Sequence, residues 1–343
     1  MTTRPITTPA TMAAMAQPPN PFLGTGCGGG RGGGRVDIVN TLSTMDDLVK
    51  QWTGVFGFPV TPMKKDLSLD LDALGHNVDA MTKHPFCAFV ASGGTGELYS
   101  LTPDETEQVI RVSVDAAQGR MPVVAGVGFN PAIGVDVAKR AERAGAKCLL
   151  VLPPYYQNPP EEGLYQYYEA IGNATGLPLL IYSREWAVFS PQMIAKLAER
   201  VPTLAGWKDG QGDIRKYQRI INYVGDRLVW FGGIGDDCVP GYFAAGVQAY
   251  TSSISNIAPK LSLMLADAGM KRDFVTLNAL MDKYVHPLYA IRDRLRGYEV
   301  SVMKEAMEML GMAAGPVRPP LINTRPQDIE DVRKLMQVYA DVL

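Results

Sequence analysis

The sequence has few residues of the kinds that build disulfide frameworks and metal sites. Its 343 residues include four cysteines and three histidines, and none of them falls in a C-x-x-C or H-x-x-x-H spacing. Widely separated cysteines indicate reduced thiols of a cytoplasmic protein rather than a disulfide framework. The scattered histidines disfavour a zinc site, although carboxylates alone could still bind a hard cation. We therefore expect chemistry without a metal centre.

An excess of charge of one sign and long apolar runs are lacking as well. Lysine and arginine number 33 against 35 aspartates and glutamates, which gives a formal net charge of -2. Near-neutrality without a strongly basic stretch disfavours nucleic acid or an anionic membrane surface as a partner. No apolar run approaches the roughly 18 residues needed to cross a bilayer. These absences predict a soluble protein.

The first 44 residues differ in composition from the rest. Residues 2–20 are rich in threonine, alanine and proline, and residues 28–35 contain six glycines and two arginines. Such a segment buries too little apolar surface to offset the entropy of ordering, so we predict a disordered extension over residues 1–44. We interpret it as an upstream extension, with Met45 as the functional start. A mitochondrial-type presequence and an RGG-like RNA-binding segment are the alternatives.

From residue 54 onward, short apolar runs alternate with amphipathic stretches, and the alternation repeats eight times. We predict strands at residues 54–60, 88–91, 122–126, 147–152, 178–182, 203–208, 228–232 and 249–252, and helices at 70–83, 103–118, 132–144, 161–175, 191–199, 213–224 and 237–245. Eight such units predict the α/β class and a closed (β/α)8 TIM barrel over residues 45–258. Thr102-Pro-Asp-Glu105 fits a capping box, and Ser190-Pro191 fits a helix start.

The last part of the chain, residues 259–343, has an entirely helical pattern. We expect one barrel-closing helix followed by a helical segment, with helices at residues 271–296 and 299–310 and a last helix from residue 327. The methionines in this region fall among leucines, which indicates ordinary packing.

Lys208 carries the strongest chemical signal in the sequence. It ends the apolar run 203–207 and precedes the glycine-rich segment Asp209-Gly-Gln-Gly212. A lysine where a buried strand meets such a loop is poorly solvated, and desolvation lowers the pKa of its amine until it can attack a carbonyl. The pattern favours a Schiff-base lysine over an ordinary lysine at a strand end.

Other polar segments end neighbouring predicted strands. They are Ser92-Gly-Gly-Thr-Gly-Glu97, Pro153-Pro-Tyr-Tyr156, Tyr182 and Gly235-Asp-Asp237. Because a TIM barrel gathers the carboxyl ends of its strands at one mouth, we expect these segments to meet Lys208 there. Backbone N–H groups of the glycine-rich segment, together with the Thr95 hydroxyl, are suited to a carboxylate. We expect Asp236 and Asp237 to cap the following helix rather than act as bases.

These motifs, in this order, resemble those of the dihydrodipicolinate synthase/N-acetylneuraminate lyase superfamily. The resemblance rests on Phe58-Pro-Val-Thr-Pro62, Gly93-Gly-Thr-Gly-Glu97, Pro153-Pro-Tyr-Tyr156, Leu180-Ile-Tyr182 and Gly206-Trp-Lys-Asp209. Within the superfamily, the chain is most similar to the 5-dehydro-4-deoxyglucarate dehydratases. That likeness rests on Lys208-Asp-Gly-Gln-Gly-Asp213, on the segment 235–246 and on Thr251-Ser-Ser-Ile-Ser-Asn256.

The resemblance implies an oligomer, a dimer of dimers, and a role for each matching residue. Lys208 would form the imine, with Tyr182 as the proton shuttle beside it. Gly94 and Thr95 would hold the carboxylate next to the ketone, and Tyr156 would reach into a neighbouring subunit's site. The reaction would be the decarboxylating dehydration of 5-dehydro-4-deoxyglucarate to 2,5-dioxopentanoate, a step of glucarate catabolism, with no cofactor.

Two positions depart from the synthase pattern. Gly94 replaces the first of two adjacent threonines, and Ala187 occupies the position of the synthase arginine, five residues after Tyr182. Both departures count against dihydrodipicolinate synthesis. Arg184 lies two residues after the tyrosine, and we expect its guanidinium to bind the far carboxylate of a diacid. An ion pair with Glu185 is the alternative for that arginine.

Weaker expectations concern the end of the eighth strand, where Ser253 and Asn256 would hydrogen-bond substrate hydroxyls. Two other functions are compatible with the same residues. One is a class I aldolase that cleaves a 2-keto-3-deoxy sugar acid to pyruvate and an aldehyde. The other is a non-catalytic keto-acid sensor, which the presence of both Lys208 and Tyr182 disfavours.

Overall fold

The structure is a computed structural model that describes residues 52–343. The predicted disordered extension over residues 1–44, together with Met45, lies outside the described residues. None of the helices within residues 52–343 is both long and apolar enough to span a membrane.

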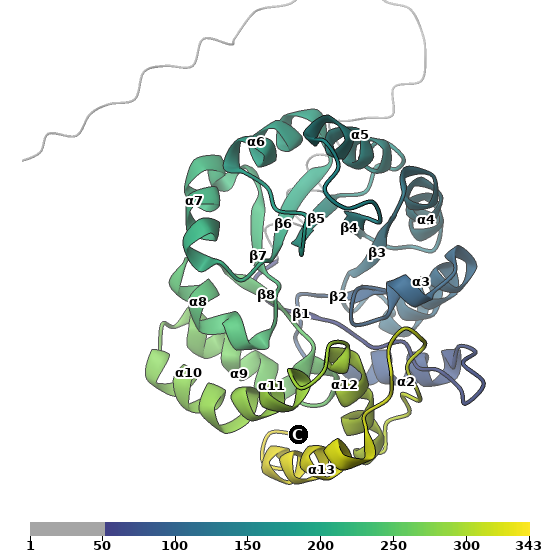
Figure 1. Ribbon diagram of the computed structural model, residues 1–343, viewed down its shortest axis with the longest axis vertical. Helices are drawn as coiled ribbons and strands as arrows, with labels where there is room; N and C mark the ends of the chain where they lie inside the picture. The colour runs from purple at the N-terminus through teal and green to yellow at the C-terminus, as the bar shows by residue number, and fades with distance from the viewer. Residues whose placement is uncertain (1–51) are drawn as a thin grey trace, which may run out of the picture. The chain divides into compact units, whose positions relative to one another are not determined.

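Eight parallel strands form a closed barrel in chain order (Figure 1). The strands are β1 (Gly54–Gly57), β2 (Ala88–Ala91), β3 (Val123–Phe129), β4 (Cys148–Pro154), β5 (Leu179–Arg184), β6 (Leu204–Gly210), β7 (Val229–Gly232) and β8 (Ala249–Ser252). Pairing of β1 with β8 closes the ring. The predicted (β/α)8 TIM barrel is confirmed, and each strand lies within a few residues of its predicted position.

Helices between the strands cover the outside of the barrel (Figure 1). They are α2 (Leu71–Met81), α3 (Pro103–Ala117), α4 (Pro131–Arg143), α5 (Glu161–Gly172), α6 (Pro191–Arg200), α7 (Ile214–Val224) and α8 (Val239–Ala244). Both predicted helix starts are confirmed. The Thr102 side chain accepts from the Glu105 N–H while the Glu105 side chain accepts from the Thr102 N–H, and the Ser190 side chain accepts from the Met193 N–H.

Side chains along each strand alternate between the barrel interior and the layer beneath the helices, because the period of a strand is two residues. The interior is filled by residues such as Phe56, Leu150 and Leu180. In the register of β5 with β6, Leu180 pairs with Gly206 and Tyr182 pairs with Lys208. Tyr182 and Lys208 therefore point into the barrel interior, near its carboxyl-terminal mouth.

After the barrel the chain forms α9 (Pro259–Met270), α10 (Phe274–Leu280), α11 (His286–Arg292), α12 (Tyr298–Met309) and α13 (Pro326–Tyr339). The expected helix over residues 271–296 is confirmed over residues 274–292, which are helical throughout. Its start shifts because Arg272 adopts a left-handed conformation, with φ of 56°, and Asp273 caps a new helix. A π-helical turn at Met281–Val285 joins α10 directly to α11.

Proline explains the other departures in this region. The π-turn precedes Pro287, whose nitrogen cannot donate to the preceding turn and whose ring crowds a carbonyl there. The expectation of an entirely helical segment is wrong for residues 310–325, which are irregular. This stretch contains Gly311, Gly315 and three prolines, and these residues disfavour continuation of α12. It returns past the barrel towards α2 and α3 before α13 begins (Figure 1).

Candidate active site

A cavity of about 310 Å³ opens at the carboxyl ends of the strands, the end of the barrel that carries the chemistry in this fold. Residues within or just after six of the strands line it, together with α11 and the start of α12. Of the predicted site residues, the cavity wall contains Gly94, Thr95, Tyr182, Arg184, Lys208 and Ser253, whereas Tyr156 and Asn256 are not part of it.

Lys208 lies at the inner end of this cavity with only 3% of its surface exposed. Its Nζ donates to the Gly233 carbonyl at 2.7 Å and lies 3.3 Å from the centre of the Tyr182 ring. Burial lowers the pKa of Lys208 well below its ordinary value, the nearby charge of Arg184 lowers it further, and Asp209 opposes the shift. A neutral amine has a free lone pair, so this lysine is suited to attack a carbonyl.

Tyr182 is buried beside the amine. Its hydroxyl donates to the same Gly233 carbonyl at 3.3 Å. Burial raises the pKa of Tyr182 above its ordinary range, while the charge of Arg184 opposes that shift. The phenol is therefore protonated at neutral pH and can donate a proton to a group that forms at the lysine.

Gly233 is a functional position that the sequence reasoning missed. Its carbonyl accepts hydrogen bonds from both Lys208 and Tyr182. A Cβ at this position would lie 2.4 Å from the Lys208 Cγ and 2.7 Å from its Nζ. Only glycine allows the backbone to approach the lysine so closely, and the Gly232-Gly233 pair at the end of the seventh strand was the available signal.

The loop after β2 forms one side of the cavity with Gly94 and Thr95. Arg184 extends over this loop, because its Nη1 lies 3.1 Å from the position that a Cβ of residue 94 would occupy. The Arg184 Nε also lies 3.4 Å from the Glu185 Oε1. The alternative, an ion pair of Arg184 with Glu185, is therefore present. Arg184 also forms part of the cavity wall.

Another side of the cavity is built from the ends of β7 and β8 and from α11. The Asp236 carboxylate is fully buried and accepts from the hydroxyls of Ser252 and Ser253 and from the Ser253 N–H. The Tyr289 hydroxyl accepts from the Asp236 N–H at 2.6 Å. Asp236 thus ties the β7 end to the β8 end, and the prediction that it caps the following helix is wrong, since α8 has no side-chain cap.

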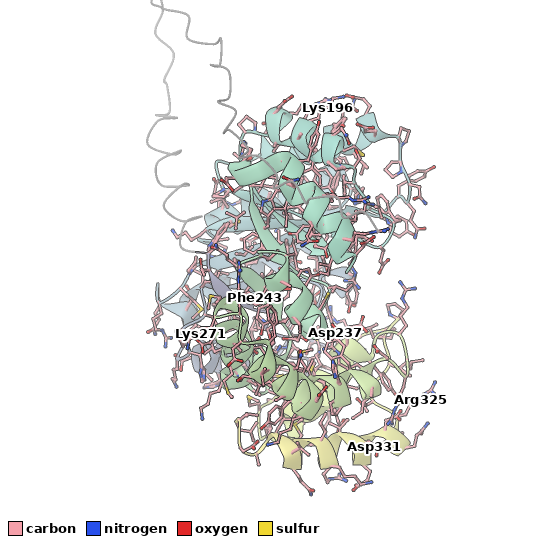
Figure 2. All side chains as sticks on the ribbon, turned by 90° about the vertical axis from the view of Figure 1, so that its left-hand side faces the viewer. Lys196, Asp237, Phe243, Lys271, Arg325 and Asp331 are labelled. Carbon is pink, nitrogen blue, oxygen red and sulfur yellow. The ribbon has the colours of Figure 1, made fainter. Side chains whose placement is uncertain are left out.

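Asp237 and Arg292 belong to the same side of the cavity (Figure 2 labels Asp237). Burial raises the pKa of the Asp237 carboxyl, and the charge of Asp236 adds to the shift. Arg292, from the end of α11, donates to the Ser253 hydroxyl at 2.9 Å. The sequence reasoning missed Arg292, because an arginine about forty residues after the last strand carries no local sign of facing the barrel mouth.

The remaining predicted site residues occupy different surroundings. Asn256 is not available to a substrate: its Oδ1 accepts from the Val60 N–H, and its Nδ2 donates to the carbonyls of Phe58 and Ser253. Its amide joins the ends of β8 and β1, so the expected contact with a substrate hydroxyl is wrong. Tyr156 follows β4 and is 73% exposed.

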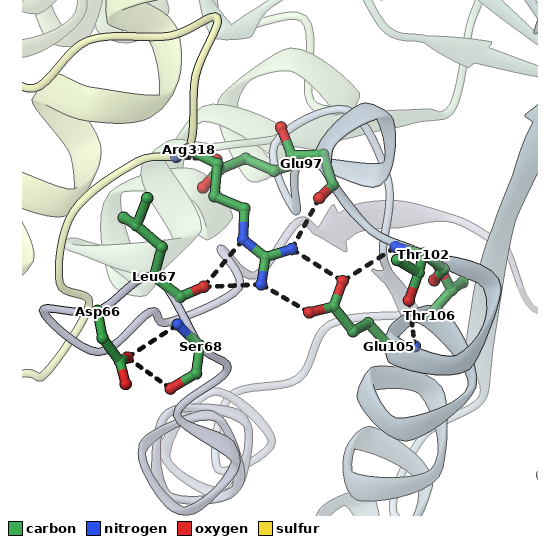
Figure 3. A network of polar contacts seen from close by, with 9 residues as sticks. Asp66, Leu67, Ser68, Glu97, Thr102, Glu105, Thr106 and Arg318 are labelled. Carbon is green, nitrogen blue, oxygen red and sulfur yellow. Dashed lines mark hydrogen bonds and ion pairs between the residues drawn. The ribbon is translucent and has the colours of Figure 1, made fainter.

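The C-terminal segment contacts the end of the loop after β2, as Figure 3 shows for Arg318 and Glu97. Glu97, at the end of that loop, forms an ion pair with Lys304 of α12, and the two side chains are 0% and 2% exposed. Glu97 also accepts from the Arg318 N–H at 3.1 Å. The Arg318 guanidinium in turn pairs with Glu105 at 2.6 Å and donates to the Leu67 carbonyl at 2.7 Å.

Within residues 52–343, no group of three or more His, Cys, Asp or Glu side chains is placed to hold a metal ion. The cavity instead offers a buried amine, a phenol beside it, a glycine-rich loop and two arginines. This set can form an imine with a keto acid and move protons at it, with cationic groups for carboxylates.

The chain belongs to the dihydrodipicolinate synthetase family, whose family model matches residues 51–339. The expected resemblance is thereby confirmed. Crystal structures of dihydrodipicolinate synthase from Bacillus clausii and from Oceanobacillus iheyensis are similar to it, with TM-scores of 0.81 and 0.82. Each is 26% identical in sequence; the matches cover 85% and 87% of this chain and 99% of each synthase.

The curated relatives are more similar in sequence, and they have a different name. A protein of Bradyrhizobium diazoefficiens named probable 5-dehydro-4-deoxyglucarate dehydratase is 39% identical over 83% of this chain and 91% of its own length. A protein of Methylobacterium radiotolerans with the same name is 40% identical over 78% of this chain and 89% of its own length. The likeness to the dehydratases that the motifs predicted is confirmed.

Proposed function

We propose that the protein is a lyase that converts 5-dehydro-4-deoxyglucarate to 2,5-dioxopentanoate, water and carbon dioxide. The observation that carries the proposal is the pairing of Lys208 and Tyr182 on adjacent strands, with a depressed amine pKa, inside a cavity that also contains two arginines. The names of the relatives support the substrate.

The substrate carries a ketone beside one carboxylate, then a methylene, then two carbons with hydroxyls and the second carboxylate. The Lys208 amine adds to the ketone, and loss of water from the adduct gives an iminium ion. Tyr182, protonated in this site, supplies a proton to the departing oxygen. The iminium withdraws electrons from the neighbouring methylene and acidifies it.

Two eliminations then follow from one electron sink. Loss of a proton from the methylene gives an enamine, whose electrons expel the adjacent hydroxyl as water and leave a conjugated iminium. The bond between the far carboxylate and its carbon next supplies an electron pair to that iminium, and carbon dioxide departs. Protonation of the resulting dienamine, ketonisation of its enol to the aldehyde, and hydrolysis release 2,5-dioxopentanoate and the free lysine. Neither metal nor organic cofactor is needed for this sequence.

Binding supports the same substrate. The near carboxylate would lie on the loop of Gly94 and Thr95, where backbone N–H groups and a hydroxyl can donate. Ser253 would contact a substrate hydroxyl from the opposite part of the wall. The positive charges of Arg184 and Arg292 would stabilise the dianion.

We also propose that the protein assembles as a homotetramer built from dimers, in which Tyr156 completes the site of a neighbouring subunit. The exposure of Tyr155 and Tyr156, 86% and 73%, supports a covering partner, because tyrosines are enriched at interfaces.

The test is mass-spectrometric analysis of products after incubation with 5-dehydro-4-deoxyglucarate. We expect 2,5-dioxopentanoate and carbon dioxide, no product with Lys208→Ala, and a rate about a hundredfold lower with Tyr182→Phe, the size typical for one proton-transfer group. Pyruvate and tartronate semialdehyde would instead identify the aldolase. Unchanged substrate, with a keto acid still trapped on Lys208, would favour the sensor.

A further inference from the structure

Arg292 is a cation with unused hydrogen-bonding capacity in the wall of the active-site cavity. A guanidinium carries five N–H donors, and the described residues give Arg292 a hydrogen bond only to the Ser253 hydroxyl, at 2.9 Å. Its Nε is buried and has no partner there. The guanidinium lies over the Tyr289 ring, 4.4 Å from its centre. Among residues 52–343, no carboxylate lies within 4 Å of it.

Arg184 differs from Arg292 in having a carboxylate beside it. It is already paired with Glu185, at 3.4 Å, and it lies against Gly94. That loop is the one assigned to the carboxylate beside the ketone. A keto diacid whose near carboxylate lies between the loop and Arg184 extends its other end towards the remaining wall. Arg292 supplies positive charge in that wall, beside Ser253.

We infer that Arg292, rather than Arg184, binds the far carboxylate and selects keto acids that carry a second carboxylate group. This inference rests on the proposed function, because it assigns a residue to the far end of the proposed substrate. Burying an arginine with few hydrogen-bond partners destabilises a protein, and a bound carboxylate that accepts from the other N–H groups of Arg292 would reduce this penalty. A guanidinium can make a two-point contact with a planar carboxylate.

Acidic residues near Arg292 would weaken its attraction for the far carboxylate, which suits a reaction that removes that carboxylate. The charges of Asp236, Asp237 and Glu299 act on it from a distance, and Asp293 also lines the cavity. During loss of carbon dioxide, the negative charge leaves the far carboxylate. A contact stronger in the ground state than in the transition state slows a reaction. Partial screening of the Arg292 charge by these carboxylates would therefore allow binding without strong resistance to the loss of carbon dioxide.

The experiment measures imine formation with keto acids that cannot undergo the elimination. The probes are 2-oxoadipate, which has two carboxylates and the six-carbon length of the substrate, 2-oxohexanoate, which lacks the second carboxylate, and pyruvate. Each is titrated into the protein with cyanoborohydride, and mass spectrometry gives the concentration for half-maximal labelling of Lys208. The variants are Arg292→Gln, Arg292→Lys and Arg184→Gln, with the exposed Arg219→Gln as a matched control outside the cavity.

We expect the unmodified protein and Arg219→Gln to prefer 2-oxoadipate over 2-oxohexanoate by about tenfold or more, the size of one charge-assisted contact. Arg292→Gln should abolish this preference and leave the value for pyruvate within about twofold. Arg292→Lys retains the positive charge and should keep part of the preference. This second variant keeps the test valid if Arg292→Gln does not fold. Arg184→Gln should weaken labelling by all three acids.

Two results would overturn the inference. One is an unchanged preference in both Arg292 variants while the protein stays folded. The other is loss of the preference in Arg184→Gln alone, which would assign the far carboxylate to Arg184. Because imine trapping requires neither dehydration nor decarboxylation, a protein that makes no 2,5-dioxopentanoate can still show the preference. Failure of the proposed function and failure of this inference are thus separate outcomes.

Discussion

Single residues in this site are held in states that would be unfavourable elsewhere in the protein. Lys208 is buried next to the Gly233 carbonyl and the Tyr182 ring. Burial shifts the pKa of Lys208 downward and so favours the neutral amine, because an ammonium loses its hydration on burial. The property that makes Lys208 reactive therefore also makes it costly for folding.

Replacing Lys208 by methionine should stabilise the protein in a pH-dependent manner. The pKa of Lys208 is lowered on folding, so between that lowered value and about 10.4 the unfolded chain binds more protons, and stability rises with pH. Methionine removes this dependence. We expect the melting temperature of Lys208→Met to exceed that of the original by at least about 2 °C at pH 7, with the difference shrinking towards pH 10. Calorimetry at both pH values measures it. If the difference in melting temperature were the same at pH 7 and pH 10, the gain in stability would come from packing of the methionine and not from removal of the ionisable amine.

At the scale of elements, the loop after β2 depends on contacts from the far end of the chain. Glu97 of this loop is fully buried, and its charge is balanced by Lys304 of α12, which also donates to the Pro316 carbonyl at 2.9 Å. Burial lowers the pKa of Lys304, and the charge of Glu97 opposes that shift. The C-terminal helices thus do more than cover the barrel, because they fix the loop that would bind the near carboxylate.

Breaking this buried pair on one side should be strongly destabilising. Lys304→Ala leaves the Glu97 carboxylate buried without its cation, and such losses are about 3–5 kcal/mol in free energy of unfolding. The matched control is Lys271→Ala, which breaks an exposed pair with Asp267 and should change stability by less than about 1 kcal/mol. Urea denaturation measures both.

The Lys304→Ala substitution should also weaken binding by the loop after β2. In Lys304→Ala, we expect pyruvate to label Lys208 only at higher concentration, since Gly94 and Thr95 are no longer held in place. Equal stability and equal pyruvate labelling in the two alanine variants would show that the ion pair does not support the loop.

At the scale of the whole molecule, the family match gives a boundary to test. The model of the dihydrodipicolinate synthetase family matches from residue 51, and the first strand begins at Gly54. We propose that residues 1–44 are an extension that the barrel does not need. A chain that starts at Met45 should keep the full activity, the melting temperature within about 1 °C, and the assembled mass by light scattering, expected to be that of a tetramer. Loss of activity or of assembly in the shortened chain would assign the extension a function.

The barrel was predictable because its signals are local and repeated. Alternation of short apolar runs with amphipathic stretches reflects the periods of strands and helices, and each βα unit repeats the same pattern. Strand positions such as Ala88–Ala91 and helix starts such as Thr102 followed from these signals. Where the prediction failed, over residues 310–325, glycines and prolines end α12 and the chain stays irregular until α13.

The site was predictable only in part. Lys208, Tyr182, Gly94 and Thr95 lie at strand ends, so the topology of a parallel barrel brings them to one mouth. The sequence by itself therefore determined the fold and the position of the buried lysine and the glycine-rich loop at one mouth of the barrel. Only the tertiary structure showed that the Asn256 amide hydrogen-bonds to backbone groups and that the Gly233 carbonyl accepts from both Lys208 and Tyr182. It also showed that Arg292 of α11 forms part of the cavity wall. The physical reason is that these contacts join segments far apart in the chain, and their partners depend on packing that no local pattern records.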